Sequence, residues 1–456
     1  MTSPLPLHEF PIETVEPNAA RDPRDNRVVL VSLAALLMFG PLAFGTVDPW
    51  SIFILQAASA VLFVIWALSQ LRSTQISIQW SPAFPPMMTF SGLMCVQLLP
   101  GISAYQHATF SQLLLYISYG AICFLLVQAL TRSREVRSVA TALTIYGTSI
   151  ALFAVVQNLS APTKLYWLKT PHLGGWIYGP YVNHNHYAGL MEMLIPVPLV
   201  FAFSRFGQSH ERWIAASVAA FMAATLFLSG SRGGMIAFTV QFAIFLAFVF
   251  RERQRRNLAI LLSAFLLLST GVIAWTGGHE VKARIATLAA EKHSDISTDI
   301  RLQIDRDILR MWRKRPVLGW GQGTFADVYP RFRSFYTDSL VNAAHNDYLQ
   351  VLAETGILGF GVMMWLLVSV LRPALRKSHK WASDLNGAVA VAAILGISGI
   401  IVHSVVDFNM QIPANAALFY SFCTVAAMEP RFKTHRRVHR QQHAEYFADA
   451  AAPVNS

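Results

Sequence analysis

The chain has 456 residues, of which 54% are hydrophobic and only 13% charged, and its formal net charge is +11. Soluble domains carry roughly 25% charged residues, so this composition excludes an ordinary soluble protein. The apolar residues gather in blocks of about 17–25, the length that crosses a hydrocarbon core of ~30 Å. We therefore expect an all-α, polytopic integral membrane protein.

Twelve apolar blocks are predicted to be transmembrane helices. Nine of them lie within 28–275, with an outer loop near 159–184, and three lie within 348–429. A large outer loop is expected at 276–347, with polar, disordered cytoplasmic ends at 1–27 and 430–456. The expected spans are 28–47, 50–71, 83–99, 111–131, 137–158, 185–204, 212–229, 234–250, 258–275, 348–371, 386–409 and 412–429.

Arginine and lysine gather at every second connector between these spans. This alternation follows the positive-inside rule and predicts a bacterial inner-membrane protein with both termini in the cytoplasm. The excess positive charge is thereby explained by topology and does not indicate nucleic-acid binding. The basic connectors lie near residues 21–27, 132–137, 205–212, 251–256, 372–380 and 431–440.

Within the large outer loop, Ile300, Ile304, Ile308 and Met311 recur at helical spacing opposite several arginines. This pattern predicts an amphipathic helix whose apolar face turns towards lipid or protein. Asp305-Arg306-Asp307 resembles a metal-binding DxD string, but on a helix residues i and i+2 point some 200° apart. The outer loops show no convincing cluster of metal ligands, so we expect neither a metal nor a cofactor.

Four of the predicted helices begin at the outer face with a dense polar motif. A helix N-terminus presents unpaired N–H groups and the positive end of the helix dipole, which together favour anions. Several such ends beside an arginine would suit a phosphate or pyrophosphate headgroup. The motifs are Asn183-His184-Asn185-His186-Tyr187, Ser229-Gly230-Ser231-Arg232-Gly233-Gly234, His345-Asn346-Asp347-Tyr348 and Asp407-Phe408-Asn409-Met410-Gln411-Ile412-Pro413.

Each motif also has a simpler interpretation, because Ser, Asn and Asp are common helix caps. Arg232 could snorkel to the membrane interface instead of binding a ligand. His345 is a candidate general base, since histidine titrates near neutral pH, or else a hydrogen-bonded capping residue.

Several embedded ionisable residues are expected to orient helices or partners rather than to react. Glu354 lies nine residues after His345, inside a span, and Glu192 is similarly embedded. His403 and Asp407 are four residues apart, so they are expected to share one helix face and to pair.

These strings together resemble the O-antigen ligase/polymerase superfamily, membrane glycosyltransferases that use undecaprenyl-pyrophosphate-linked glycans. The resemblance covers about residues 180–425, and its most specific part is the pattern HN-x-x-L-x-x-x-x-E-x-G after a large outer loop. The strings that carry it are SGSRGG around Arg232, Arg301 leading into DILRMWRKRPVLGWGQGTF, HNDYLQVLAETGILG at 345–359 and HSVVDFNMQIPAN at 403–415.

The resemblance implies a GT-C-like fold and an inverting, metal-independent transfer of a glycan from its lipid pyrophosphate to an acceptor hydroxyl. Arg232 and Arg301 would neutralise the pyrophosphate, and His345 would act as base or orient the acceptor. Arg306 and Arg310 are rivals of Arg301 for this role. Further donor contacts are expected from Asn183, His184, Asn185, His186 and Asn346.

The expected partners are an undecaprenyl-pyrophosphate-linked donor, a glycan or lipid acceptor and membrane lipid, at the periplasmic face. Ligase, polymerase and protein oligosaccharyltransferase differ only in the acceptor, and all three remain open. A transporter or flippase for lipid-linked glycans is the alternative from another class. That alternative predicts inverted repeats and polar residues near the bilayer midplane, whereas these polar motifs gather at one face.

Overall fold

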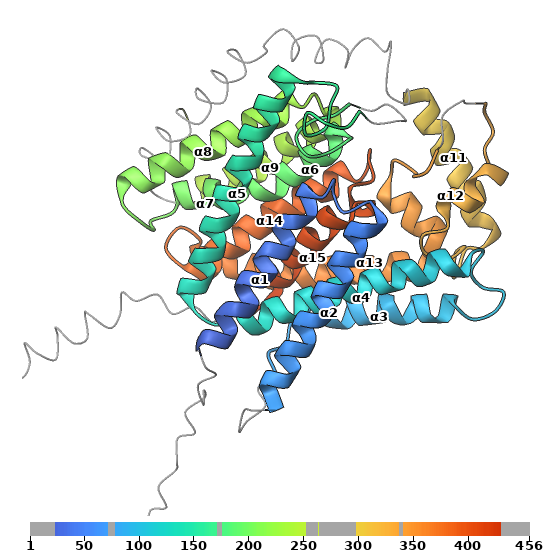
Figure 1. Ribbon diagram of the computed structural model, residues 1–456, viewed down its shortest axis with the longest axis horizontal. Helices are drawn as coiled ribbons and strands as arrows, with labels where there is room; N and C mark the ends of the chain where they lie inside the picture. The colour runs from blue at the N-terminus through green and yellow to red at the C-terminus, as the bar shows by residue number, and fades with distance from the viewer. Residues whose placement is uncertain are drawn as a thin grey trace, which may run out of the picture.

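The computed structural model describes residues 23–71, 78–170, 176–251, 263, 298–336 and 341–429 (Figure 1). Its regular elements in these ranges are helices, with two isolated β-bridges, which confirms the all-α expectation. The helices are α1 Pro23–Leu42, α2 Pro49–Leu71, α3 Phe84–Gln97, α4 Gln106–Ala129, α5 Ser133–Ser160, α6 His184–Leu194, α7 Pro196–Phe203, α8 Ser209–Leu228, α9 Arg232–Phe250, α11 Thr298–Lys314, α12 Phe325–Val328, η1 Tyr329–Arg331, α13 Asp347–Lys377, η2 Ser378–Lys380, α14 Leu385–His403, η3 Asn409–Gln411 and α15 Pro413–Ala427.

Eight spans in the described ranges are long and apolar enough to cross a membrane, so the chain is a multi-pass membrane protein. Helices α1, α3 and α15 coincide with three further expected spans. The expected span at 258–275 and the first part of the outer loop, 276–297, lie outside the described residues, as do the two chain ends. The count of twelve therefore stays a prediction.

Two expected spans differ from the structure. The sixth is divided into α6 and α7 at Ile195, because Pro196 has no N–H to continue the helical hydrogen bonds, although Ile195 itself keeps a helical backbone. The eleventh was expected to run to residue 409, but α14 ends at His403. Asp407 therefore lies in the connector to α15, and the prediction that it shares a helix face with His403 is wrong.

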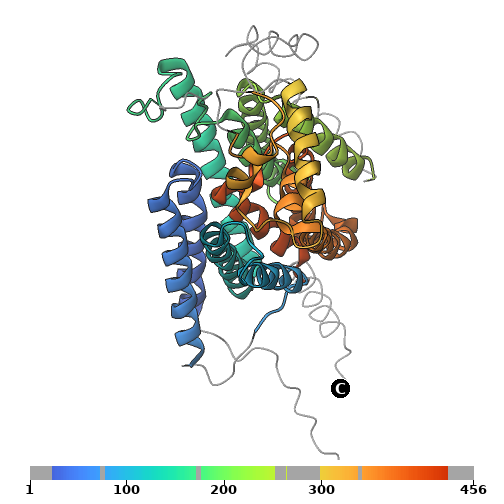
Figure 2. The ribbon, with the colours of Figure 1, turned by 90° about the vertical axis from the view of Figure 1, so that its right-hand side faces the viewer.

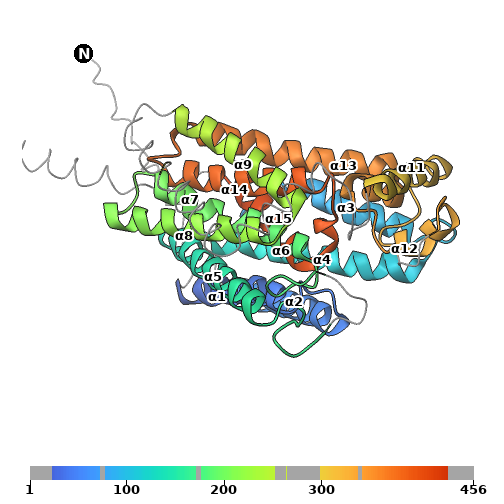
Figure 3. The same cartoon turned by 90° about the horizontal axis from the view of Figure 1, so that it is seen from above.

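The spans pack in layers around α14 and α6, which lie between the α1–α2 pair on one long side and α9 and α13 on the other (Figures 2 and 3). Helix α14 is apolar all round because neighbours surround it on every side. In the α6–α7 span, 89% of the most apolar stretch is buried inside the protein. The motif at its start therefore faces protein rather than lipid.

The described part of the outer loop, residues 298–336, packs as a small helical layer over one end of α13 (Figure 1). Ile304, Ile308 and Met311 of α11 are fully buried together with Tyr329 and Ala353. The apolar face of the amphipathic helix therefore turns towards protein, which decides between the two expected orientations.

Candidate functional site

The starts of α6, α9, α13 and α15 meet at the connector between α14 and α15. Asn409 in this connector packs against Gly189 of α6 and accepts a hydrogen bond from Asn415 of α15 (3.1 Å). A Cβ added at Gly233, near the start of α9, would lie 2.8 Å from the His403 ring. The four polar motifs, distant in sequence, therefore form one cluster.

His345 is held in an unusual backbone conformation directly before α13. Its φ of 52° lies in the left-handed region, which few residues other than glycine adopt. The flanking residues fix it: Asn346 caps Leu349 N–H (3.2 Å), and the Gln350 side chain accepts from Ala344 N–H (2.9 Å). Strain of this kind gathers at functional sites, where the surroundings enforce it.

Asp347 fastens the start of α13 to the α14–α15 connector. Its carboxylate accepts hydrogen bonds from the Ser404 hydroxyl (2.8 Å), Met410 N–H (3.1 Å) and the Gln411 amide (3.3 Å). Its own N–H donates to Ser404 O (2.9 Å). These bonds fix how His345 faces the connector that carries Asp407.

Asp407 is the carboxylate that faces His345. Its Oδ1 lies 3.8 Å from His345 Nδ1, and the two side chains are 1% and 15% exposed. The His345 ring also packs edge-on against Phe408, with centroids 4.8 Å apart. Burial opposes ionisation of Asp407, but the interactions with His345, His186 and His403 outweigh it and hold its pKa well below the usual range.

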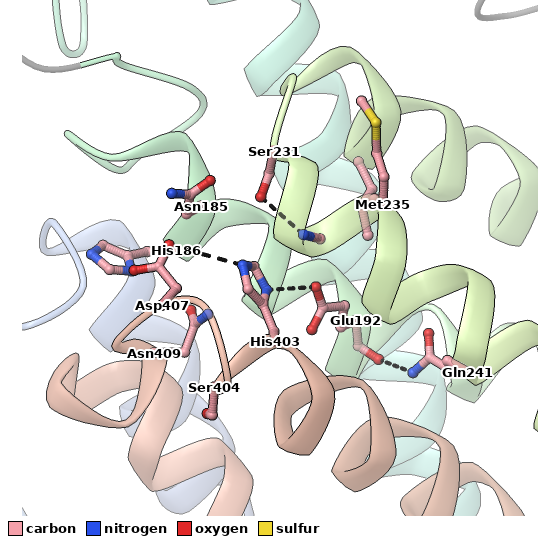
Figure 4. Close-up of polar contacts among 12 residues, drawn as sticks. Asn185, His186, Glu192, Ser231, Met235, Gln241, His403, Ser404, Asp407 and Asn409 are labelled. Carbon is pink, nitrogen blue, oxygen red and sulfur yellow. Dashed lines mark hydrogen bonds and ion pairs between the residues drawn. The ribbon is translucent and has the colours of Figure 1, made fainter. Parts of the chain in front are cut away.

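On the far side of Asp407, His403 pairs with Glu192 of α6 (Figure 4). His403 Nδ1 lies 2.8 Å from Glu192 Oε1, and His403 Nε2 lies 3.9 Å from Asp407 Oδ2. Glu192 and His403 are fully buried. The His403–Asp407 pairing is thus present, although the helix ends between the two residues.

The residues of the Asn183–His186 motif have two roles: some cap or anchor the start of α6, and His186 joins the polar cluster. Asn183 caps α6 by accepting from Asn185 N–H (2.8 Å), and His184 Nδ1 lies 2.9 Å from Ser229 O. Asn185 is partly exposed. His186 is buried beside Asp407 and Phe408, with ring centroids 4.8 Å apart for the aromatic pair (Figure 4).

The arginines occupy distinct places. Arg301 of α11 donates to Val406 O (2.9 Å), directly before Asp407. Arg310 is paired with buried Asp307, which also accepts from Ser334 N–H (2.9 Å). Arg306 is exposed on the surface of α11. Of the three rivals in this helix, Arg301 is therefore the one that borders the cluster.

Arg232 is the first residue of α9 and is partly exposed. Ser231 caps the helix by accepting from Gly234 N–H (3.1 Å), as expected for a serine before a helix. Gly233 packs against the His403 ring, so the start of α9, which carries Arg232, lies beside His403.

Residues 217–364 match the family model described as O-antigen ligase. The chain carries an O-antigen ligase domain. No curated protein matches it. The match confirms the resemblance to the O-antigen ligase superfamily over these residues.

The O-antigen ligase domain contains Arg232, Arg301 and His345, whereas Asp407 and His403 lie beyond its matched segment. It also contains Glu354, which is fully buried and accepts from Phe325 N–H (3.0 Å) and the Gln350 amide (3.4 Å). Glu354 thus ties the outer loop to α13, in agreement with an orienting role.

Asp305 and Asp307 of the O-antigen ligase domain do not act together. Asp307 is fully buried in its network with Arg310, while Asp305 is partly exposed and its pKa is raised by burial. No group of three or more His, Cys, Asp or Glu among the described residues is arranged to hold a metal ion.

Sequence reasoning missed two contributors to this site. Asp347 reads as a helix cap, and its bonds to residues more than fifty positions later leave no local signal. Gly233 stands in the polar motif around Arg232, but nothing in the sequence indicates that its missing side chain admits His403. Both roles depend on tertiary contacts.

Proposed function

We propose that this protein transfers a glycan from undecaprenyl pyrophosphate to an acceptor hydroxyl at the periplasmic face of the inner membrane. The observation that carries the proposal is the pairing of His345 with the buried Asp407 carboxylate, bordered by Arg301 and by the helix that begins with Arg232. The match to the O-antigen ligase family supports the same reaction class.

His345 serves as the base. With Nδ1 turned towards Asp407, the opposite ring nitrogen, Nε2, is left to accept the proton of the acceptor hydroxyl. The Asp407 carboxylate fixes the ring and stabilises the imidazolium that forms, as in other histidine–carboxylate pairs. The left-handed backbone at residue 345 holds the ring at this position.

In the transfer, the acceptor oxygen attacks the anomeric carbon opposite the pyrophosphate, and the anomeric configuration inverts. The new glycosidic bond forms as the bond from the anomeric carbon to the pyrophosphate oxygen breaks, and undecaprenyl pyrophosphate departs with that electron pair. Arg232 and Arg301 neutralise the charge that develops on the leaving group, which guanidinium groups can do without a divalent ion.

The donor headgroup is expected to approach the converging starts of α6, α9 and α13. The positive dipole ends of these helices favour a phosphate there. Asn185 and Asn346, which are partly exposed at these starts, are proposed to contact the headgroup or its first sugar. Arg306 and Arg310 are proposed as secondary contacts farther along α11.

The periplasmic orientation is testable by cysteine labelling. Cysteines introduced at exposed outer-loop positions such as Arg306 should react with a membrane-impermeant thiol reagent in intact spheroplasts. Cysteines at Arg376 should react only after lysis, because the basic connector follows the positive-inside rule. Labelling of Arg376→Cys in intact spheroplasts would contradict the orientation.

The test of the reaction is transfer from purified lipid-linked donor by His345→Ala, with donor binding measured in parallel. Turnover should fall by roughly 10²–10⁴-fold, the usual contribution of a general base. Donor binding should be spared, since the base acts on the acceptor. His107→Ala, at an exposed histidine near the start of α4, is the matched control. Near-normal turnover of His345→Ala would reduce this histidine to a helix-start residue.

A further inference from the structure

A buried acid–base pair lies behind the proposed catalytic residues and has no part in the chemistry described above. Glu192 and His403 are both fully buried and come from α6 and the end of α14. Burying two ionisable groups is costly unless they are paired, and even a paired group is often replaceable by apolar residues. The burial of both groups therefore indicates a role other than stabilising the fold.

The geometry connects the pair to His345 through Asp407. Carboxylate and imidazole groups alternate along the line Glu192, His403, Asp407, His345, with separations of 2.8, 3.9 and 3.8 Å. One ring nitrogen of His403 faces each neighbouring carboxylate. Only the imidazolium form carries a proton on both nitrogens and can donate towards both carboxylates.

The same pair touches the helix that begins with Arg232. Gln241 of α9 donates from its amide to Glu192 O and Leu395 O, both at 2.7 Å. Gly233 lies so close to His403 that an added Cβ would stand 2.9 Å from Nε2. The His403 ring is thus enclosed between the start of α9 and the Asp407 connector.

Resting on the proposed function, we propose that Glu192 and His403 are positioning residues that hold Asp407 behind His345 and set the start of α9, which carries Arg232, relative to it. The pair would couple the group that activates the acceptor to a group that binds the pyrophosphate. Neither residue touches the substrates, so their effect reaches the reaction only through Asp407 and the start of α9.

The first test is a set of substitutions with separate measurements of kcat and KM. Glu192→Gln keeps an oxygen that can accept from His403 but removes the charge, and His403→Gln removes the two-sided ring. Each should lower kcat by roughly 10- to 100-fold, the usual effect of changing an outer partner of a functional histidine. The KM values should change little, and thermal unfolding of the purified variants identifies any that fail to fold.

Gly233→Ala tests the contact with α9 without replacing an ionisable group. Its new methyl group must displace the His403 ring and the neighbouring Val406 side chain, which precedes Asp407, so this variant should reproduce the loss of kcat seen in His403→Gln. Gly361→Ala is the matched control, since a Cβ there meets no atom within 4 Å. The control should retain normal kcat.

A double-mutant cycle separates positioning from a merely structural role. If Glu192 acts through Asp407, then Glu192→Gln should add little to the loss already caused by Asp407→Asn. A pair that only holds α6 to α14 would lower stability, leave the kcat of the folded protein normal and give independent effects in the cycle.

The outcomes also separate this proposal from the proposed function. Absence of transfer by the unmodified protein would overturn both. Transfer by the unmodified protein with normal kcat in Glu192→Gln and His403→Gln would overturn the positioning role alone. Reduced kcat in both variants, non-additive with Asp407→Asn, is the result that we expect.

Discussion

Replacing Asp407 with asparagine removes one charge and almost no volume. Asp407 Oδ1 lies 3.8 Å from His345 Nδ1, and Asp407 is 1% exposed. Two unit charges at about 4 Å interact by roughly 1 kcal/mol in a water-like medium and about 4 kcal/mol at the effective dielectric of a protein site. Because Asp407 is buried, the upper part of this range, about 2–4 kcal/mol, applies.

This energy is available only when His345 becomes an imidazolium, so its loss falls on the transition state. At about 1.4 kcal/mol per factor of ten, kcat should fall by roughly 30- to 1000-fold in Asp407→Asn. Transfer from purified lipid-linked donor measures kcat, and donor binding should stay close to normal. Asp327→Asn, at an exposed carboxylate of α12, is the control. A kcat within threefold of the unmodified protein would refute the assignment of Asp407 as the partner of the base.

Three further predictions follow from the same contacts. Arg232→Lys keeps the charge but loses the bidentate fork, so transfer and donor binding should weaken strongly, whereas Arg331→Lys, at an exposed arginine of η1, should do little; equal activity of the two variants would contradict the role of Arg232. Gly356 has φ 65° and ψ −166°, a conformation open almost only to glycine, and any Cβ there would collide with the Val317 carbonyl. Gly356→Ala should therefore destabilise the protein by more than about 2 kcal/mol, as measured by thermal unfolding. The folded state holds the pKa of Asp407 below its unfolded value of about 3.9, so its ionised form stabilises the fold above that value and this stabilisation is lost as pH falls through the lower folded pKa. The difference in melting temperature between the unmodified protein and Asp407→Asn should accordingly be constant from about pH 7 to 5 and shrink below about pH 4; a difference that already disappears near pH 6 would contradict the depressed pKa.

The helices of this chain could be predicted closely because their signals are local. Blocks of apolar residues define the spans, and serine and asparagine mark the starts of α9 and α13. The boundary that failed, at the end of α14, is set by tertiary contacts. Residues 404–410 leave the helix to meet the carboxylate of Asp347, a partner that no nearby residue reveals.

The site was predictable as a set of motifs on one face but not as a geometry. Charge and spacing point to His345 and Arg232 separately. Nothing local indicates that Glu192, eight residues into α6 from its start at His184, meets His403 from the end of α14. Likewise Arg301, Arg306 and Arg310 are equivalent as a pattern, and only the fold brings Arg301 to Val406 and commits Arg310 to Asp307.

The choice between a glycosyltransferase and a transporter is the central one, and a single reconstitution addresses it. The purified protein would be placed in vesicles with undecaprenyl-pyrophosphate-linked glycan and a hydroxyl acceptor, in the presence of EDTA. The account predicts glycosylated acceptor with inverted anomeric configuration and one undecaprenyl pyrophosphate released for each glycan transferred. Movement of intact donor across the vesicle membrane with no glycosylated acceptor, or transfer that requires an added divalent metal, would contradict it.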